Sequence, residues 1–188
     1  MQVWELIALD AEQGARALIR EYGDHLYATA FRLCLNESDA EDLVQRTLVN
    51  VVTHISSFSG KSSFFTWMCA ILVNFRRMDL RKKGANALVF DEQEVESEDS
   101  SPTPADRAER EDEAALMRKA VSKLPEDLRT VVVLHYFNGM SVQAIAKALP
   151  APEGTVYSRL HDARKKIRKI FQRLSTFDAS KLVKGLKT

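Results

Sequence analysis

The stretch PEDLRTVVVLHYFNGMSVQAIAKALPAPEGTVYSRLHDARKKIRKIFQRL, residues 125–174, decides how the rest of the chain is interpreted. It holds three consecutive patterns of apolar residues at helical spacing. The first pattern starts at Pro125, a residue that suits the first helical position, and Asn138-Gly139 supplies a stop signal. The sequence therefore predicts a helix from Pro125 to this stop.

A short helix and a long basic helix follow. We expect Ser141 to cap the short helix and Pro150 and Pro152 to break it. Gln143 and Lys147 lie on its outer face. Its apolar residues share the opposite face: Val142, Ile145, Ala146 and Leu149. The long helix restarts near Glu153 to Thr155. Its apolar residues lie within about 60° of one line at roughly 100° per residue: Val156, Leu160, Ala163, Ile167, Ile170, Phe171 and Leu174.

The far side of the long helix is basic. Residues 153–173 carry seven basic and two acidic side chains, a net charge of +5. A short helix, a proline-marked turn and such a basic helix together predict a DNA-reading helix-turn-helix whose last helix fits a groove lined by phosphates. The alternative from this segment alone is a three-helix bundle with a solvated basic face.

The charge of the 188-residue chain is unevenly distributed. Residues 1–83 are neutral, residues 84–113 have a net charge of −9, and residues 114–188 have a net charge of +10. This contrast predicts a neutral module, an acidic tether and a basic module. Residues 84–105 are acidic and poor in apolar side chains, so we interpret them as a flexible linker. Two interpretations of its acidic side chains remain open. They either compete with DNA phosphates for the basic helix or only keep the linker soluble and extended.

The first 83 residues predict three helices. Residues 13–35 form the first, which Asn36 is expected to close, and Ser38 with Glu41 forms an S-x-x-E capping box that opens the second. The loop SSFSGKSS follows, with Phe58 and Lys61 expected to be exposed. A third helix from about Ser63 to Lys83 begins with aromatic residues and ends in RRMDLRKK. A further helix is expected from Asp106 to Lys123.

The basic end of the third helix has two readings. Basic residues near a helix C-terminus suit the helix dipole. Aromatic groups beside a basic strip are also how proteins hold unstacked single-stranded bases.

Some functions are disfavoured by what the sequence lacks. Cys34 and Cys69 lie in apolar helical patterns without a zinc-binding spacing, so we expect buried free thiols and no metal or cofactor. The start of the chain has no basic segment before an apolar run, and no later stretch approaches the roughly 18 apolar residues of a membrane span. We therefore expect a cytoplasmic protein without membrane insertion.

Four ordered blocks resemble one family. They are DAEDLVQRTL (39–48), FSGKSSFFTWMCAILVN (58–74), LPEDLRTVVVLHYFNGMSVQAIAKAL (124–149) and EGTVYSRLHDARKKI (153–167). They resemble the extracytoplasmic-function sigma factors of bacterial RNA polymerase. The resemblance implies an all-helical, non-enzymatic protein of two domains, 1–83 and 106–175, joined by the linker 84–105 and followed by a tail at 176–188. It also implies binding to core RNA polymerase and promoter DNA, DNA strand opening at the start of transcription, and an anti-sigma partner.

The same resemblance implies three groups of binding residues. The polymerase-docking face would hold Asp42, Gln45 and Leu48. The minus-ten element would be read by Phe58, Ser59, Gly60, Lys61, Trp67, Asn74, Arg77 and Arg81. We expect Trp67 to pack within the protein rather than to be inserted as a wedge into the DNA. The minus-thirty-five element would be read by Thr155, Ser158, Arg159, His161, Arg164 and Lys165. Among these, Arg159 can read a guanine with two hydrogen bonds, whereas Lys165 can only neutralise phosphate.

Three positions depart from the family pattern, and two other functions remain open. Arg46 stands where the family commonly has an acidic residue, and Tyr157 and Asp162 stand where it often has basic residues. The promoter sequence that family members recognise therefore cannot be transferred to this chain. One alternative is a stand-alone helix-turn-helix repressor or activator that dimerises on a palindrome, which leaves the aromatic helix after the small-residue loop unexplained. The other is an enzyme, disfavoured because the four histidines are scattered without a nucleophile, phosphate loop or metal spacing.

Overall fold

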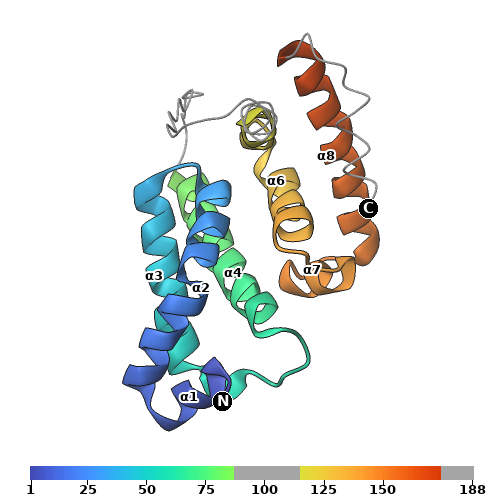
Figure 1. The fold of residues 1–188 in the computed structure, drawn as a ribbon. Helices are drawn as coiled ribbons and strands as arrows, with labels where there is room; N and C mark the ends of the chain where they lie inside the picture. The colour runs from blue at the N-terminus through green and yellow to red at the C-terminus, as the bar shows by residue number, and fades with distance from the viewer. Residues whose placement is uncertain (87–114, 175–188) are drawn as a thin grey trace, which may run out of the picture.

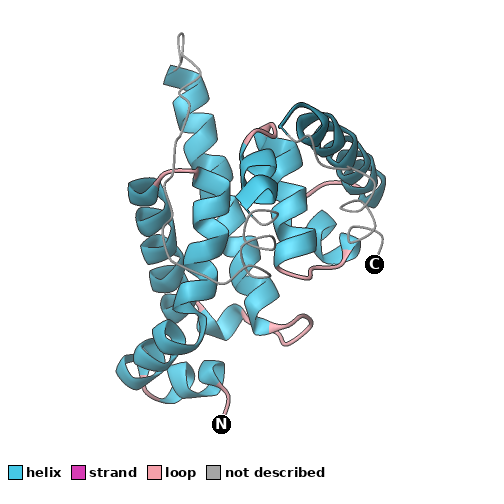
Figure 2. Ribbon diagram, turned by 45° about the horizontal axis from the view of Figure 1, so that its top comes forward, coloured by secondary structure: helices cyan, strands magenta, loops and turns pink. Residues whose placement is uncertain are grey.

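The computed structural model describes residues 1–86 and 115–174, and every regular element in these ranges is a helix. Residues 115–122 are helical, and the other elements in chain order are α1 (Val3–Leu9), α2 (Ala11–Cys34), α3 (Glu37–Thr53), η1 (Ile55–Ser57), α4 (Phe64–Asn86), α6 (Glu126–Val132), η2 (Val133–Phe137), α7 (Val142–Ala148) and α8 (Glu153–Leu174). Figures 1 and 2 show α2, α3 and α4 as one bundle, with α6, α7 and α8 as a second group beside it. The expected all-α fold is confirmed.

The linker and the tail fall largely outside the described residues. The expected linker at 84–105 is described only up to residue 86, and the expected tail at 176–188 lies wholly outside. The expected helix at 106–123 is described from residue 115, where it is helical to residue 122.

The junction between α2 and α3 differs from the sequence prediction. α2 ends at Cys34, with Leu35 in the left-handed conformation (φ 57°). Asn36 then begins α3, because its side-chain oxygen accepts a hydrogen bond from the backbone N–H of Asp39 at 3.0 Å. Ser38 is the second residue of this helix, two positions after the N-cap, and cannot serve as its N-cap. The predicted capping box is therefore wrong, although the helix it was meant to start is present.

The core of the first bundle is built from the predicted apolar positions. α2, α3 and α4 each contribute side chains with almost no exposed surface, among them Leu18, Leu26, Leu33, Leu43, Val51, Met68 and Leu72. The short helix α1, which the sequence analysis did not predict, packs against α2 and adds Val3 and Ile7 to this core. Ser63 accepts a hydrogen bond from the backbone N–H of Thr66 at 3.1 Å, so it caps α4 as the predicted start requires.

The helix-turn-helix half follows the prediction with one irregularity. Pro125 is the N-cap of α6 instead of its first helical residue. The helix changes to π geometry at η2, where the N–H of Asn138 bonds to the carbonyl of Val133 at 3.1 Å. Gly139 follows with φ 65°, a left-handed conformation that glycine adopts without strain, and ends the helix. Ser141 then caps α7, as predicted, by accepting from the N–H of Ala144.

Candidate nucleic-acid interface

α8 presents a basic face to solvent. Its apolar seam, Val156, Leu160, Ala163, Ile167 and Phe171, is buried against α6 and α7. The opposite face is exposed and carries Ser158, His161, Arg164, Lys165, Arg168 and Lys169. Burial of the apolar side stabilises the helix in the fold, so the basic side needs no protein contacts and can face phosphates and base edges. The six predicted minus-thirty-five residues therefore share α8, and four of them are exposed.

Thr155 and Arg159 are the two predicted readers that are half-buried. The Nε atom of Arg159 lies 3.7 Å from a carboxylate oxygen of Asp127 on α6, and 32% of its side chain is exposed. Such a partly exposed ion pair is worth about 0–1 kcal/mol, so it orients the guanidinium without preventing its release to a base.

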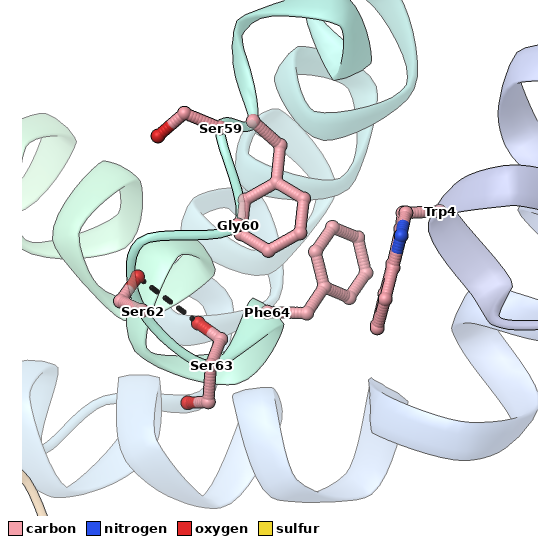
Figure 3. A pocket seen from close by; sticks show the side chains of 7 residues that line it. Trp4, Ser59, Gly60, Ser62, Ser63 and Phe64 are labelled. Atoms are coloured by element: carbon pink, nitrogen blue, oxygen red, sulfur yellow. Dashed lines mark hydrogen bonds between the residues drawn. The ribbon is translucent and has the colours of Figure 1, made fainter.

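The loop between α3 and α4 forms a pocket of about 350 Å³. Its lining consists of Trp4, Phe58, Ser59, Gly60, Ser62, Ser63 and Phe64. Figure 3 shows Trp4 on the opposite side of the Phe64 ring from the loop residues Gly60, Ser62 and Ser63. The volume lies at the lower end of the roughly 300–1,000 Å³ typical of small-ligand pockets.

Aromatic rings hold the loop in place. Phe58 was expected to be exposed but is half-buried, with ring-centroid distances of 5.1 Å to Phe64 and 5.3 Å to Trp67. Trp67 also stacks on Phe64 at 5.7 Å, so its ring is part of this cluster. Gly60 lies at the outer turn with φ 70°, and Lys61 next to it is exposed. The four predicted loop residues thus comprise one anchored ring and three exposed neighbours.

A polar stripe continues from the pocket along α4. Asn74 and Arg81 are exposed and Arg77 is half-exposed. They occupy positions i, i+3 and i+7, which lie on one face of a helix. The remaining minus-ten residues of the prediction therefore lie on one line of α4.

The outer face of α3 holds the predicted polymerase contacts. Asp42 and Gln45 are exposed, Leu48 is half-buried, and the neighbouring Val49 is a large apolar side chain left in solvent. These side chains lie on adjacent turns of the helix, so they form one continuous surface.

Arg46, on the same helix, is engaged by side chains of α3 and α4. Its guanidinium forms two hydrogen bonds to Asp79 of α4, at 3.1 and 2.6 Å, lies 2.9 Å from a carboxylate oxygen of Asp42, and covers the ring of Phe75. The hydrogen bonds from Arg46 hold the pKa of the Asp79 carboxyl below its usual value. This residue, which departs from the family pattern, therefore ties α3 to α4.

The two halves of the protein, residues 1–86 and 115–174, are in contact through polar side chains. We call this the closed arrangement. The Thr29 hydroxyl donates to Asn138 Oδ1 at 3.2 Å, and Asn138 Nδ2 donates to Cys69 Sγ at 3.3 Å. Burial raises the pKa of the Cys69 thiol to about 12. The guanidinium of Arg32 lies 4.7 Å from the centre of the Phe137 ring. Neither Cys34 nor Cys69 is in a disulfide bond; Cys69 is buried and Cys34 is partly buried.

An ion-pair network crosses the same interface. Arg76 of α4 donates to Glu126 of α6 at 3.1 Å, and Arg129 bonds to the same carboxylate from within the second half. Arg76 and Arg129 are both buried. Because a buried guanidinium is costly without a partner, this shared carboxylate favours the closed arrangement of the two halves.

The described residues, 1–86 and 115–174, hold neither a metal-binding cluster nor a membrane-spanning helix. No group of three or more His, Cys, Asp or Glu side chains there is placed to hold a metal ion. None of the helices in these ranges combines the length and apolar composition needed to cross a membrane.

These surfaces define an all-helical DNA-binding protein with a helix-turn-helix and a separate aromatic loop site. The family models agree: Sigma-70 region 2 matches residues 18–86 and Sigma-70, region 4 matches residues 114–167. The chain is 30% identical to the ECF RNA polymerase sigma factor SigW of Bacillus subtilis over 159 residues, 79% of this chain and 83% of SigW. It is 29% identical to the RNA polymerase sigma-H factor of Pseudomonas aeruginosa over 168 residues, 84% and 86% of the two chains.

Solved structures show the same fold. The sigma factor RpoE of Bartonella quintana, solved in complex with the anti-sigma factor NepR, has a TM-score of 0.68 at 26% identity, over 84% of this chain and 96% of RpoE. CnrH, solved with the cytosolic domain of CnrY, matches in fold with a TM-score of 0.64 at 24% identity, over 92% and 97% of the two chains. The chain therefore belongs to the extracytoplasmic-function sigma factors of the sigma-70 family. It is an alternative sigma factor for promoter recognition and transcription initiation, and not an enzyme.

Proposed function

We propose that this chain carries core RNA polymerase to promoters by reading two DNA elements with two separate surfaces. Residues 1–83 act as the domain that binds polymerase and the minus-ten element, and residues 106–175 act as the domain that binds the minus-thirty-five element. Residues 84–105 act as the tether between them, and residues 176–188 form a tail. The protein works in the cytoplasm, where polymerase and promoters are.

The observation that carries the proposal is the pocket at the start of α4 with the polar stripe that follows it. A base can be read outside the duplex only after it has been unstacked, at a cost of a few kcal/mol. Aromatic walls compensate for lost stacking, and the cationic stripe of Arg77 and Arg81 attracts the adjoining backbone. In this assignment Phe58, Ser59, Gly60 and Lys61 hold a flipped base, Trp67 supports the pocket, and Asn74 contacts the strand. A regulator that reads only duplex DNA has no use for such a pocket.

α8 reads the duplex in this proposal. Its exposed face carries side chains of two kinds: those that can recognise base edges and those that neutralise phosphates. Arg159 is suited to two hydrogen bonds with a guanine, whereas Lys165 acts as a point charge. Thr155, Ser158, His161 and Arg164 complete the contact surface on the same helix.

The outer face of α3 docks on polymerase. Asp42 and Gln45 supply polar contacts, and Leu48 with the exposed Val49 supplies apolar area. Interfaces of this kind combine a small apolar centre with a polar rim. The Arg46–Asp79 pair fixes the angle between α3 and α4, and so sets the docking face relative to the stripe.

The closed arrangement of the halves must open when the protein joins polymerase. The loop pocket of the first half and α8 of the second half can reach separate promoter elements only when the two halves are apart. In the closed arrangement, α7 contacts α4. An anti-sigma factor, such as the NepR bound to the solved relative RpoE, is the partner we expect to hold this chain inactive.

Reconstitution with core polymerase tests the proposal. The purified chain is mixed with core enzyme and a genomic promoter library, and the transcript starts are sequenced. We expect starts to cluster downstream of a shared pair of sequence elements, and no such starts with core enzyme alone. The free chain should bind the same promoters weakly and with little specificity. A sharp footprint from the free chain at moderate salt, together with no polymerase-dependent starts, would favour the stand-alone regulator.

A further inference from the structure

Trp4 lines the loop pocket although it lies outside the segment that matches region 2 of the family. It comes from α1, whereas the family match begins at residue 18. Its ring centroid lies 5.4 Å from that of Phe58 and 5.4 Å from that of Phe64. The three rings therefore contact one another, with one member supplied by a separate helix.

α1 is fixed firmly enough to position this ring. Val3 and Ile7 of α1 are buried, and the backbone N–H of Gln2 donates to the carboxylate of Glu5 at 2.8 Å. α1 approaches α2 at Gly14, where an added Cβ would lie 2.4 Å from Ile7 Cα. A separation below 3.0 Å from a backbone atom cannot be relieved by a side-chain movement. Only a glycine at this position lets α1, and with it Trp4, lie where it does.

The chemistry of the pocket suits a nucleobase. Trp4 and Phe58 provide aromatic surface, backed by the buried ring of Phe64, and the hydroxyls of Ser59, Ser62 and Ser63 with the Gly60 backbone provide hydrogen-bonding groups around it. Trp4 lines the pocket and is only partly buried, whereas the burial of α1 is carried by Val3 and Ile7. A planar ring with polar edges, drawn out of the duplex, is the ligand that stacks on such walls.

We propose that Trp4 is a DNA-contacting residue: its indole forms the outer wall against which the flipped base of the opened strand rests. This inference rests on the proposed function of the loop. It extends the DNA-reading surface to α1, so the base contacts two segments that are distant in sequence.

A coupling experiment between Trp4 and individual bases tests the inference. Holoenzyme is assembled with the wild-type chain, Trp4→Ala, Trp4→Phe or Leu9→Ala, and binding is measured to labelled single-stranded oligonucleotides of the opened strand. The strand is taken from a promoter mapped by transcript-start sequencing, and each position is replaced in turn by an abasic site. Leu9 is the matched control, because it lies on the same helix and is 77% exposed outside the pocket.

We expect one position at which the abasic site weakens wild-type binding by between about fivefold and 150-fold, the range for losing one stacked base. Trp4→Ala should reduce this abasic penalty, because the wall the base rests on is gone. Trp4→Phe should restore part of it, and Leu9→Ala should leave it at the wild-type value.

Gly14→Ala gives an independent arm with a matched control. Its new Cβ must displace α1, so the abasic penalty should fall as in Trp4→Ala. Gly23→Ala is the control, because its Cβ would meet only a side-chain atom of Ile19 at 3.6 Å, an ordinary contact. Each variant is first checked for unchanged helicity and for binding to core polymerase.

Two outcomes separate the failure of the inference from that of the proposed function. If Trp4→Ala weakens binding equally on intact and abasic strands, or leaves the abasic penalty unchanged while Phe58→Ala removes it, Trp4 is only a packing residue and the inference is overturned. If the wild-type holoenzyme shows no position sensitive to an abasic site, the loop does not hold a base and the proposed function of the pocket fails with it.

Discussion

Replacing Arg76 should loosen the contact between the two halves of the protein. Arg76→Met keeps the apolar stem of the side chain but removes the two hydrogen bonds to Glu126, at 3.1 and 3.4 Å, while Glu126 stays paired with Arg129. The side chains of Arg76 and Glu126 are only 10% and 25% exposed. A hydrogen bond to a charged group contributes about 1.5–3 kcal/mol. At about 1.4 kcal/mol per tenfold change, the open population should rise roughly 10- to 140-fold.

Cys69 reports this opening. Its thiol is buried, accepts a hydrogen bond from Asn138 of the other half, and has a pKa raised to about 12. Thiol reagents attack the thiolate, so Cys69 should react only when the halves separate. We therefore expect the modification rate, measured at neutral pH in a Cys34→Ala background, to rise by the same factor in Arg76→Met. When closing outpaces the reaction, this rate follows the open population.

A surface ion pair provides the control. Arg16 pairs with Glu12 at 2.8 Å, but the two side chains are 79% and 78% exposed. Arg16→Met should leave the rate at Cys69 unchanged, because such pairs are worth about 0–1 kcal/mol. Equal rates in Arg76→Met and the wild type would refute the reasoning, since the buried pair would then contribute nothing to the closed arrangement.

Three further outcomes are expected. Phe58→Ala or Asn74→Ala should leave binding to core polymerase intact but impair transcription from duplex promoters, and a premelted template should restore much of it; no rescue would show that the pocket is misplaced. Arg159→Ala should cost about 1–3 kcal/mol at one base position, whereas Lys169→Ala should weaken all sequences alike and lower the salt slope by about one; equal losses on specific and random DNA would show that Arg159 only touches phosphate. The pKa of Asp79 is lowered in the folded protein, so its ion pair stabilises the fold above the unfolded-state pKa near 3.9, and this contribution is lost as the pH falls through the folded-state pKa. The free energy of unfolding in urea, measured between pH 3 and pH 7, should therefore depend less on pH in Asp79→Asn than in the wild type. An identical pH dependence in the two proteins would contradict this assignment.

The helix-turn-helix half could be predicted from sequence because its signals are local. Ser141 caps α7 and Gly139 ends the preceding helix, as the turn chemistry of each residue requires. The buried seam of α8 follows the predicted spacing from Val156 to Phe171. The π geometry of η2 was not predicted, because it replaces one helical hydrogen-bond pattern by another without a change in apolar spacing.

The junctions and the loop site were harder to predict. Asparagine is a preferred N-cap and also occurs after helix C-termini, so Asn36 was assigned to the end of the first helix although it caps the second. α1 was missed because it is only seven residues long, although Val3 and Ile7 lie at i and i+4 and Glu5 follows Gln2 at capping-box spacing. Without α1, neither Trp4 nor the half-burial of Phe58 could be foreseen.

The contact between the halves could not be predicted at all. Thr29, Cys69 and Asn138 are far apart in sequence, and none of the three stands in a pattern that marks an interface. Arg76 appeared only as one charge in a basic helix end. Its burial against Glu126 depends on how the two halves pack against each other, which helical periodicity does not encode.

Strand opening tests the central claim most directly. Permanganate, which oxidises unpaired thymines, is applied to a mapped promoter with the free chain, with core polymerase, and with both. We expect reactive thymines around the minus-ten element only when both are present, and their loss in Phe58→Ala. Thymines that stay unreactive with the reconstituted holoenzyme, while the free chain alone protects the duplex, would contradict the account.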